Sequence, residues 1–260
     1  MEKQNVENLF NNISGKYDIA NYFISLGIEK YWRRKFSEYI STDASHILDA
    51  CCGTGISTLN IINKLKDNKF KNKKKKNKKQ TNEVVYIFGV DFSEEMLSVA
   101  RQRFLRNNLK YKSYKNQGNY QADFKIEFKQ GDVTDSDFQD NYFDIITIVF
   151  GIRNVINRAK ALKEFFRITK PGGRLIIMEF NFPQNPLFRK IYSFYMNKIL
   201  VNIGGFITKN KKAYQYLVET IRKFPSTDEF ASLIKSAGWS DVKAEKLSLE
   251  TCTIFSAVKK

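Results

Sequence analysis

The residues best suited to chemistry lie in one short glycine-bearing segment, LDACCGTG at 48–55. Gly53 and Gly55 let the backbone approach a ligand closely and adopt a positive φ. Asp49 comes directly before the turn, and Thr54 adds a hydroxyl within it. The segment lacks the lysine of a phosphate loop and the third glycine of the dinucleotide-binding pattern. It therefore predicts a binding site for a nucleoside cofactor without a phosphate.

Two further aspartates extend this candidate site. Once the lysine-rich residues 66–83 are set aside, the interval from Asp49 to Asp91 approaches the ~20 residues at which an acidic side chain meets ribose hydroxyls in βαβ units. Asp132 follows the next predicted strand, where it suits an adenine amino group. Carboxylates also suit a cofactor that carries a sulfonium and an ammonium. The alternative is a purely structural glycine turn, with aspartates that shape the loop or cap a helix.

Metal and histidine chemistry are not expected. His46 is the single histidine, and it precedes an apolar run typical of a strand. The three cysteines, Cys51, Cys52 and Cys252, are too few and too poorly spaced for a disulfide framework or a zinc site. The sequence therefore predicts no metal site and a reducing, cytoplasmic environment, which the lack of a signal-like N-terminal segment also favours.

A mostly parallel sheet must position these residues. Apolar runs typical of buried strands alternate with helical patterns, at 46–50, 84–90, 124–128, 144–150 and 174–180. A turn is expected at 170–173, KPGG, and the alternating stretches 242–247 and 252–258 predict a hairpin at the sheet edge. The prediction is one α/β domain over residues 1–260, with a Rossmann-like sheet, an antiparallel C-terminal hairpin and helices on both faces.

The formal net charge of +17 is concentrated in one segment. Residues 64–83 contain ten lysines and two acidic residues, so nearly half of the net charge lies there. Residues 66–83 are predicted to be a disordered Lys/Asn-rich insertion, because they have no apolar periodicity to offset the entropy of ordering. Residues 107–123 are predicted to be a second, polar insertion. Its tyrosines, which are interleaved with lysines, could stack on nucleic-acid bases, but a solvated insertion with no specific nucleic-acid partner is the preferred interpretation.

Several motifs resemble those of the quinone-biosynthesis C-methyltransferases, the demethylmenaquinone and 2-polyprenyl-benzoquinol methylase family. They are FNNISGKYDIANYFISLGIEKYWRR at 10–34, LDACCGTG at 48–55, GVDFSEEML at 89–97, FGIRN at 150–154, KPGGRLIIMEF at 170–180 and AYQYLVETIRKFP at 213–225. The resemblance implies a class I methyltransferase fold and S-adenosylmethionine as cofactor. The implied cofactor contacts are Asp49, the Gly53-Thr54-Gly55 turn, Asp91 with Phe92, and Asp132 with Val133. At Val149 some relatives have a serine that helps to hold the cofactor, so that contact is not expected here.

The resemblance also implies residues that act on the substrate. A ring carbon becomes nucleophilic when an ortho phenol is deprotonated, and a nearby cation stabilises the phenolate. Arg153 is the expected cation, Asn154 is expected to orient substrate oxygens, and Tyr17 is a third catalytic candidate. Asp18 and Asn21 are expected to contact the substrate from an N-terminal lid. Capping and packing within helices are the alternative roles for the N-terminal residues.

The resemblance further implies a helical lid at 1–40, and the helical periodicity beyond the fifth predicted strand indicates a second helical lid at 183–225. The second contains the amphipathic stretches 185–203 and 211–224, whose apolar stripes are typical of core packing or of a substrate lid. The predicted substrate is a polyprenylated quinol, with demethylmenaquinol preferred and a ubiquinone-pathway benzoquinol as the alternative. Contact with the inner face of a membrane and a homodimer are further expectations. The rivals are an RNA methyltransferase and a non-catalytic lysine-rich binding module.

Overall fold

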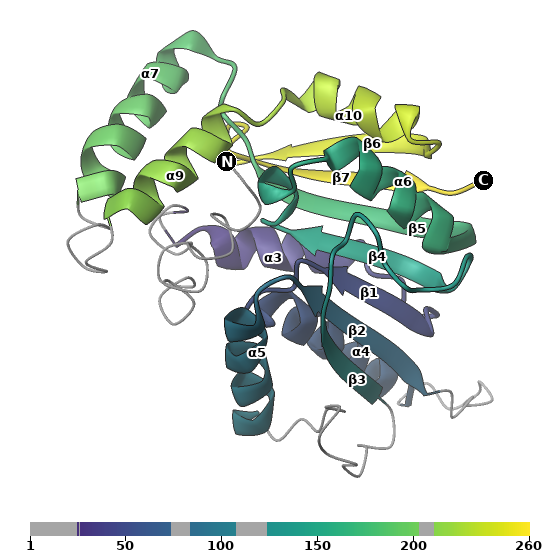
Figure 1. Cartoon of the computed structure of the whole chain (residues 1–260). Coiled ribbons are helices and arrows are strands. Elements are labelled where there is room, and N and C mark those ends of the chain that lie inside the picture. The colour runs from purple at the N-terminus through teal and green to yellow at the C-terminus, as the bar shows by residue number, and fades with distance from the viewer. Residues whose placement is uncertain (1–24, 26, 74–83, 108–123, 203–210) are drawn as a thin grey trace.

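The computed structural model describes residues 25, 27–73, 84–107, 124–202 and 211–260, without the side chains of 68–73 and 213 (Figure 1). The described elements, in chain order, are α3 (Glu29–Glu38), β1 (His46–Ala50), α4 (Ile56–Lys73), β2 (Val85–Asp91), α5 (Glu94–Arg106), β3 (Phe124–Gln130), β4 (Phe143–Val149), the 3-10 turn η2 (Ile152–Asn154), α6 (Arg158–Ile168), β5 (Thr169–Phe180), α7 (Pro186–Phe194), the π-helix η3 (Tyr195–Leu200), α9 (Lys211–Arg222), α10 (Thr227–Ser236), β6 (Ser240–Leu247) and β7 (Cys252–Val258).

One sheet runs through the molecule in the order β3-β2-β1-β4-β5-β7-β6. The first five strands of this order pair in parallel, and β7 pairs antiparallel with both β5 and β6. Strands β2 and β3 lie on one side of β1, whereas β4 and β5 lie on its other side, so the order in which strands are added to the sheet switches between β1 and β4. Ligands of open α/β sheets bind at such a switch point, beyond the carboxyl ends of the strands. The expected parallel sheet with an antiparallel C-terminal hairpin is confirmed.

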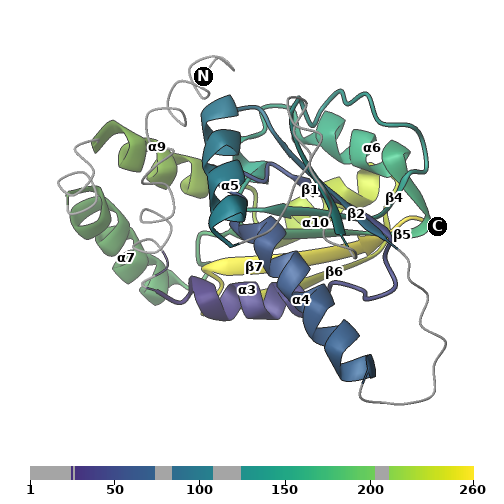
Figure 2. The same cartoon turned by 90° about the horizontal axis from the view of Figure 1, so that it is seen from below.

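Helices cover both faces of the sheet (Figure 2). On one face α3, α4 and α5 pack over a core that includes Trp32, Phe36 and Phe104. On the other face α6 and α10 pack over a second core, with Phe165 and Phe230 among its buried residues. Strands covered on both faces need apolar side chains in both directions, which explains the continuous apolar runs of the sequence.

Two boundaries differ from the sequence-based expectations. Helix α4 continues to Lys73, so residues 66–73 are helical where a disordered segment was expected. Each lysine adds a backbone hydrogen bond to an existing helix without a new nucleation step, and lysine is a good helix former. Strand β5 begins at Thr169 and includes the expected 170–173 turn as an irregularity, since Phe143 faces Thr169 but Ile145 faces Arg174.

Helices α7, η3 and α9, which follow β5, project beyond the carboxyl ends of the strands (Figure 1). The amide oxygen of Asn185 caps α7 by accepting hydrogen bonds from the backbone N–H groups of Leu187 and Phe188, both at 3.1 Å. The buried side chains of η3 and α9 join the core on the α3 side of the sheet. No helix in the described part of the chain is long and apolar enough to cross a membrane.

Candidate active site

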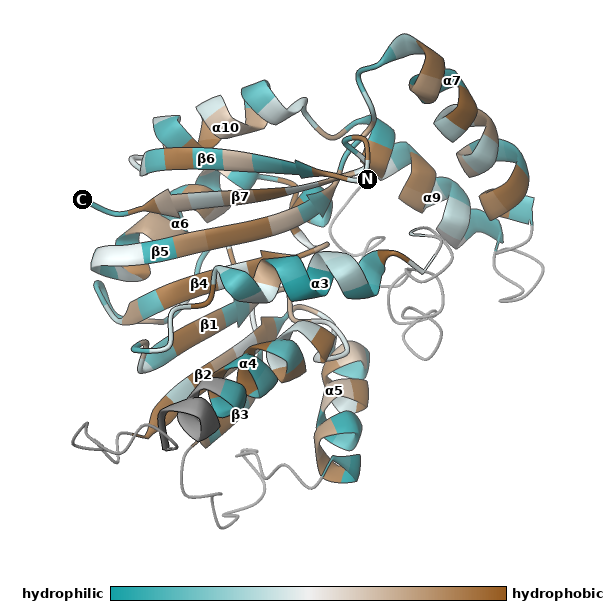
Figure 3. Cartoon of the chain, turned by 180° about the vertical axis from the view of Figure 1, so that it is seen from behind, coloured by the Kyte–Doolittle hydropathy of each residue, from teal (hydrophilic) through white to brown (hydrophobic). Residues whose placement is uncertain are grey.

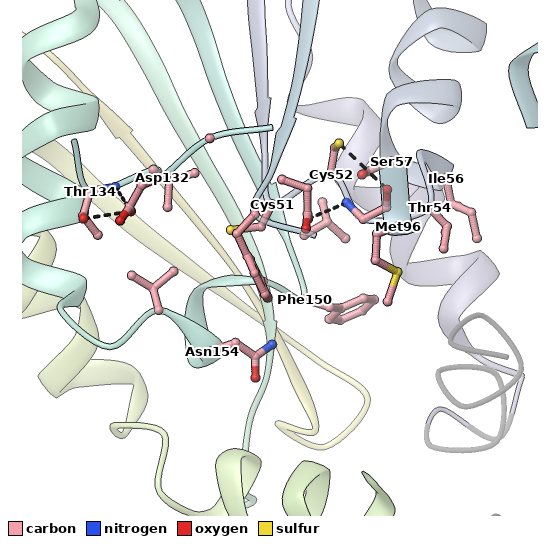
Figure 4. Close-up of a pocket in the computed structure, with 18 of the residues that line it drawn as sticks. Cys51, Cys52, Thr54, Ile56, Ser57, Met96, Asp132, Thr134, Phe150 and Asn154 are labelled. Atoms are coloured by element: carbon pink, nitrogen blue, oxygen red, sulfur yellow. Dashed lines mark hydrogen bonds between the residues drawn. The ribbon is translucent and has the colours of Figure 1, made fainter. Parts of the chain in front are cut away.

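A pocket opens at the carboxyl ends of β1, β2, β3 and β4 (Figure 4). The turn after β1 supplies Cys51 to Thr54, and the end of β2 supplies Asp91, with Phe92 directly after it. Asp132 and Val133 follow β3, and the end of β4 with the segment after it supplies Val149 to Gly151 and Asn154 to Asn157. Helix α3 adds Arg33 to the wall. The pocket therefore forms where the predicted cofactor motifs meet.

The two glycines of the first turn have different tasks. Both have positive φ, +54° at Gly53 and +77° at Gly55, a region that side chains rarely adopt. Gly53 lines the pocket, and a Cβ built on it would meet no atom within 4 Å. A Cβ on Gly55 would lie 3.0 Å from the Cβ of Ala100, on helix α5. Gly53 thus leaves backbone open towards the pocket, whereas Gly55, expected at the cofactor, serves helix packing.

Asp49 lies beneath the pocket and is not among its lining residues. Its side chain is fully buried and accepts hydrogen bonds from the hydroxyls of Ser57 at 2.8 Å, Thr58 at 2.6 Å and Thr147 at 2.9 Å. These bonds tie the start of α4 to β4 and fix the glycine turn. Burial raises the pKa of Asp49, and the three hydroxyl donors oppose that rise. The structure thus favours the alternative role for Asp49, shaping the loop.

Asp91 is one of two acidic residues that line the pocket, together with Asp132. Its carboxylate accepts hydrogen bonds from the backbone N–H of Gly53 at 2.9 Å and of Ser93 at 3.0 Å. Burial raises the pKa of Asp91 to about 6, although those backbone donors favour the charged form. The side chain is therefore a carboxylate at neutral pH, placed to accept hydrogen bonds from ligand hydroxyls. Phe92 lines the pocket beside it.

Asp132 and Val133 line the pocket just beyond the end of β3, and Figure 4 shows Asp132 beside Thr134. One carboxylate oxygen of Asp132 accepts hydrogen bonds from the backbone N–H and the hydroxyl of Thr134, both at 2.8 Å. This local turn holds the Asp132 side chain in a fixed orientation. Asp132, Asp91 and the Gly53 turn follow the neighbouring strands β3, β2 and β1 in spatial order. An elongated ligand can therefore contact all three in sequence.

Arg153 does not have the placement expected of a substrate-facing cation. Its side chain is 1% exposed and forms an ion pair with Glu179 of β5, at 2.7 Å. The same guanidinium donates to the backbone oxygen of Phe150, and the Arg153 backbone N–H donates to Glu179 at 3.1 Å. Arg153 is also not among the pocket-lining residues. The positive charge of Arg153 is neutralised by Glu179, and its contacts hold the segment 150–154 against β5.

Asn154, the next residue, does line the pocket. Its side-chain oxygen accepts a hydrogen bond from the Tyr216 hydroxyl of α9, at 3.3 Å. The amide is therefore oriented by the helical region that follows β5. The other substrate candidates, Tyr17, Asp18 and Asn21, lie outside the described residues.

The structure adds one cation that the sequence reasoning missed. Arg33 lines the pocket from α3, with its guanidinium carbon 5.5 Å from the centre of the Phe150 ring. Glu29, one helical turn earlier, lies 3.5 Å away, and the Arg33 side chain is 11% exposed. Its Nε is buried and has no hydrogen-bond partner among the described residues. The position is within the N-terminal family motif, but nothing in the sequence indicated which of the two adjacent arginines faces the pocket.

The cysteines at the pocket are protonated thiols. Burial, together with the negative charges of Asp91 and Asp49, raises the pKa values of Cys51 and Cys52 well above the ordinary value. Both thiols and that of Cys252 are free. No group of histidine, cysteine and acidic side chains that could hold a metal ion occurs in the part of the chain that the structure describes.

Comparison with known proteins connects this geometry to a family. The model of the ubiE/COQ5 methyltransferase family matches residues 1–259. The chain belongs to the ubiE/COQ5 methyltransferase family. The ubiquinone/menaquinone biosynthesis C-methyltransferase UbiE of Rickettsia felis is 37% identical over 254 residues, which cover 98% of this chain and 92% of that protein.

Solved structures support the methyltransferase fold of this family member. A SAM-dependent methyltransferase from Thermotoga maritima has a TM-score of 0.57 at 16% identity, over 98% of this chain and 100% of the other. Phosphoethanolamine N-methyltransferase 2 of Haemonchus contortus, solved with S-adenosyl-L-methionine, has a TM-score of 0.56 at 14% identity, over 88% and 52%. The class I methyltransferase fold is confirmed, and S-adenosylmethionine is the expected cofactor.

The residues of the pocket fit this cofactor. The open backbone at Gly53 allows close approach, and the carboxylates of Asp91 and Asp132 suit hydroxyl and amino donors. No phosphate needs to be held, which agrees with the absence of a phosphate-loop lysine from the turn. On the α3 side of the pocket, the buried Nε–H group of Arg33 can donate a hydrogen bond to the carboxylate of the cofactor.

Proposed function

We propose that this chain transfers a methyl group from S-adenosylmethionine to a ring carbon of a polyprenylated quinol, with demethylmenaquinol as the preferred substrate. The observation that carries the proposal is the pocket itself, which combines the family's glycine turn with Asp91, Asp132 and the substrate-side Asn154. The family membership supports the reaction class, because its model and the relatives' names both refer to methyl transfer.

In this proposal the cofactor lies across the strand ends. Asp132 accepts a hydrogen bond from the adenine amino group, and Asp91 accepts hydrogen bonds from the ribose hydroxyls. The methionine part extends past the Gly53 turn towards the β4 side, where the Arg33 guanidinium binds its carboxylate. This direction follows from chemistry, since the two acidic side chains suit donors and the arginine suits an anion. The strand order β3-β2-β1 supports this sequence from adenine to ribose to the glycine turn, and the position of Arg33 over the Phe150 ring, just after β4, supports its last step.

The protein's contribution to the chemistry is mainly positioning. When bound, S-adenosylmethionine supplies an activated methyl group, so the site must align the acceptor carbon and exclude water. Asn154, held by Tyr216, orients an oxygen of the quinol. Arg153 and Glu179 act as positioning residues, because their buried ion pair fixes the segment that carries Asn154. Methyl transfer leaves S-adenosylhomocysteine as the other product, and the sp3 ring carbon then loses its proton to water, which restores the aromatic ring.

A benzoquinol of ubiquinone synthesis is the second candidate substrate. The Rickettsia felis relative is named for both ubiquinone and menaquinone biosynthesis, which supports testing the two quinols together. Purified protein with labelled S-adenosylmethionine should methylate demethylmenaquinol faster than a demethylated benzoquinol. Asp91→Ala should abolish label transfer to either. Label in the benzoquinol alone would reverse the substrate preference, and label in neither, despite cofactor binding, would refute the quinol assignment.

An RNA methyltransferase is disfavoured by the pocket thiols. Methylation at cytosine C5 needs a cysteine thiolate as nucleophile, but burial and two nearby carboxylates keep Cys51 and Cys52 protonated. The four prolines form no Asn/Asp-Pro-Pro segment of the type used in amino-group methylation. The basic residues 64–83 lie away from every matching motif, so the net charge is not an argument for RNA chemistry.

A further inference from the structure

Helix α7 is apolar on two opposite faces, and only one of them meets the protein. Tyr192 is buried within the core, and Met196 and Leu200 of the following η3 continue that buried side. On the other side Leu187, Ile191 and Phe194 are 71%, 58% and 61% exposed. Their spacing of four and three residues places these three on one stripe of the helix. We call these three residues the outer stripe.

The surroundings of the outer stripe are basic. Residues 180–218 contain six lysines and arginines and no acidic residue. On α7 itself Arg189 and Lys190 are exposed, and Lys198 follows on η3. Figure 3 shows α7 at an extremity of the molecule, beyond the strand ends, with hydrophobic residues along it. An exposed apolar stripe flanked by cations on a projecting helix is typical of helices that lie in a membrane interface.

A hollow beside α7 adds a place for an anionic headgroup. It is lined by Phe182, Pro186, Arg189, Lys190, Ser193 and Arg222, with no acidic side chain among these residues. The guanidinium groups of Arg189 and Arg222 lie 5.4 and 5.6 Å from the centre of the Phe182 ring. The Arg222 guanidinium also donates to the Ser193 hydroxyl at 3.4 Å. The arginines are thus held in place, and their fork of donors suits a phosphate.

We infer that the outer stripe and this basic hollow form a docking surface for an anionic phospholipid bilayer. The apolar side chains enter the interface while the cations contact lipid phosphates. The surface is joined to the active site, because η3 packs against α9 and the Tyr216 hydroxyl of α9 binds Asn154 in the pocket. Docking would therefore bring α7, η3 and α9 to the bilayer, in which the polyprenyl chain of the substrate lies. This last link rests on the proposed function, whereas the docking itself does not.

Vesicle flotation of the full-length protein tests the inference. The protein should float with vesicles of equal parts phosphatidylglycerol and phosphatidylcholine, and much less with phosphatidylcholine alone. The double variant Leu187→Ser/Phe194→Ser should reduce partitioning by about tenfold or more for each side chain. Lys190→Gln should reduce it by about fivefold, because a lysine near an anionic surface contributes about 1 kcal/mol. High salt should weaken binding of the wild type.

The matched control is Leu105→Ser, compared with the single variant Leu187→Ser. Leu105 is 60% exposed, comparable to the outer stripe, but lies on α5, away from α7 (Figure 1). The control variant should float like the wild type. Equal flotation of the stripe variant and the wild type would overturn the inference, as would flotation independent of lipid charge. A dimer in light scattering that the stripe variant converts to a monomer, with no flotation, would assign the surface to a second copy instead.

Methyl transfer to a water-soluble, short-chain quinol separates the two proposals. If the proposed function is right, the stripe variant retains this activity and loses only vesicle binding. If the proposed function is wrong, the wild type lacks the activity, while its flotation result still decides the docking surface.

Discussion

Replacement of Arg33 by alanine should weaken binding of the cofactor's amino-acid part and leave its nucleoside part unaffected. The Arg33 side chain is 11% exposed and its Nε has no hydrogen-bond partner among the described residues, so a carboxylate there would gain a largely desolvated, charge-assisted partner. Such a hydrogen bond contributes about 1.5–3 kcal/mol. At about 1.4 kcal/mol per tenfold change, Kd should rise by roughly 10- to 150-fold.

Two ligands isolate this contribution. S-adenosylhomocysteine contains the amino-acid part, whereas 5′-methylthioadenosine has the same adenine, ribose and thioether without it. Calorimetry should show the full loss in Arg33→Ala for the first ligand and no change for the second. Arg34→Ala is the control, because Arg34 is exposed and lies over the Tyr31 ring instead. An equal loss for both ligands would mean that Arg33 supports the fold of the pocket, and no loss for either would refute the contact.

Three further outcomes are expected. Burial raises the pKa of Asp91 to about 6, and binding of the ribose hydroxyls needs the charged form of this side chain. The Kd of S-adenosylhomocysteine, measured by calorimetry, should therefore rise by up to about tenfold per pH unit below pH 6. In Asp91→Asn the Kd should not change between pH 5 and 7. Glu179→Gln leaves the buried guanidinium of Arg153 without its counter-charge, so urea unfolding should show a loss of about 3–5 kcal/mol, whereas Glu219→Gln in an exposed pair should show none. Gly55→Ala should lower the thermal midpoint, because a left-handed conformation costs about 1–2 kcal/mol for a side-chain-bearing residue and the added Cβ meets α5; an unchanged midpoint would contradict that packing role.

The raised pKa of Asp91 also predicts how this residue changes the free energy of unfolding with pH. A carboxyl whose folded pKa is raised binds its proton more tightly in the folded state. Ionisation of this buried carboxyl therefore lowers the free energy of unfolding. The loss is absent below pH 3.8, the ordinary pKa of an aspartate, and complete above about pH 6. Asp91→Asn should therefore unfold at higher urea concentration than the wild type at neutral pH, and this difference should vanish under acid conditions. A penalty at a position that faces the pocket is consistent with a residue retained for ligand binding.

Much of the fold could be predicted because local patterns and tertiary structure agree. The apolar runs that became β1, β2 and β4 are continuous because both faces of the sheet are covered. Serine is a preferred residue at helix N-caps, and the hydroxyl of Ser93 accepts a hydrogen bond from the backbone N–H of Met96 at 3.1 Å. The exact start of β5 was not predictable, because glycines and a proline normally mark a turn and the irregular pairing with β4 depends on the neighbouring strand.

The site was predictable only in part, since side-chain direction depends on partners far away in the sequence. Asp49 turns away from the pocket because Thr147, on the neighbouring strand β4, donates to it. Arg153 turns inward because Glu179 on β5 offers a buried counter-charge. Neither partner has a recognisable spacing from the residue it binds. Asp91 and Asp132 both line the pocket, because the carboxyl ends of neighbouring parallel strands meet at one edge of the sheet.

Product analysis tests the central claim most directly. The purified protein would be given S-adenosylmethionine labelled with ¹³C in the methyl group, together with a short-chain demethylmenaquinol, and the product would be examined by NMR. We expect one labelled methyl bonded to a ring carbon, formed by the wild type and not by Asp91→Ala. A labelled methyl on a quinol oxygen, or no transfer although the cofactor binds, would contradict it.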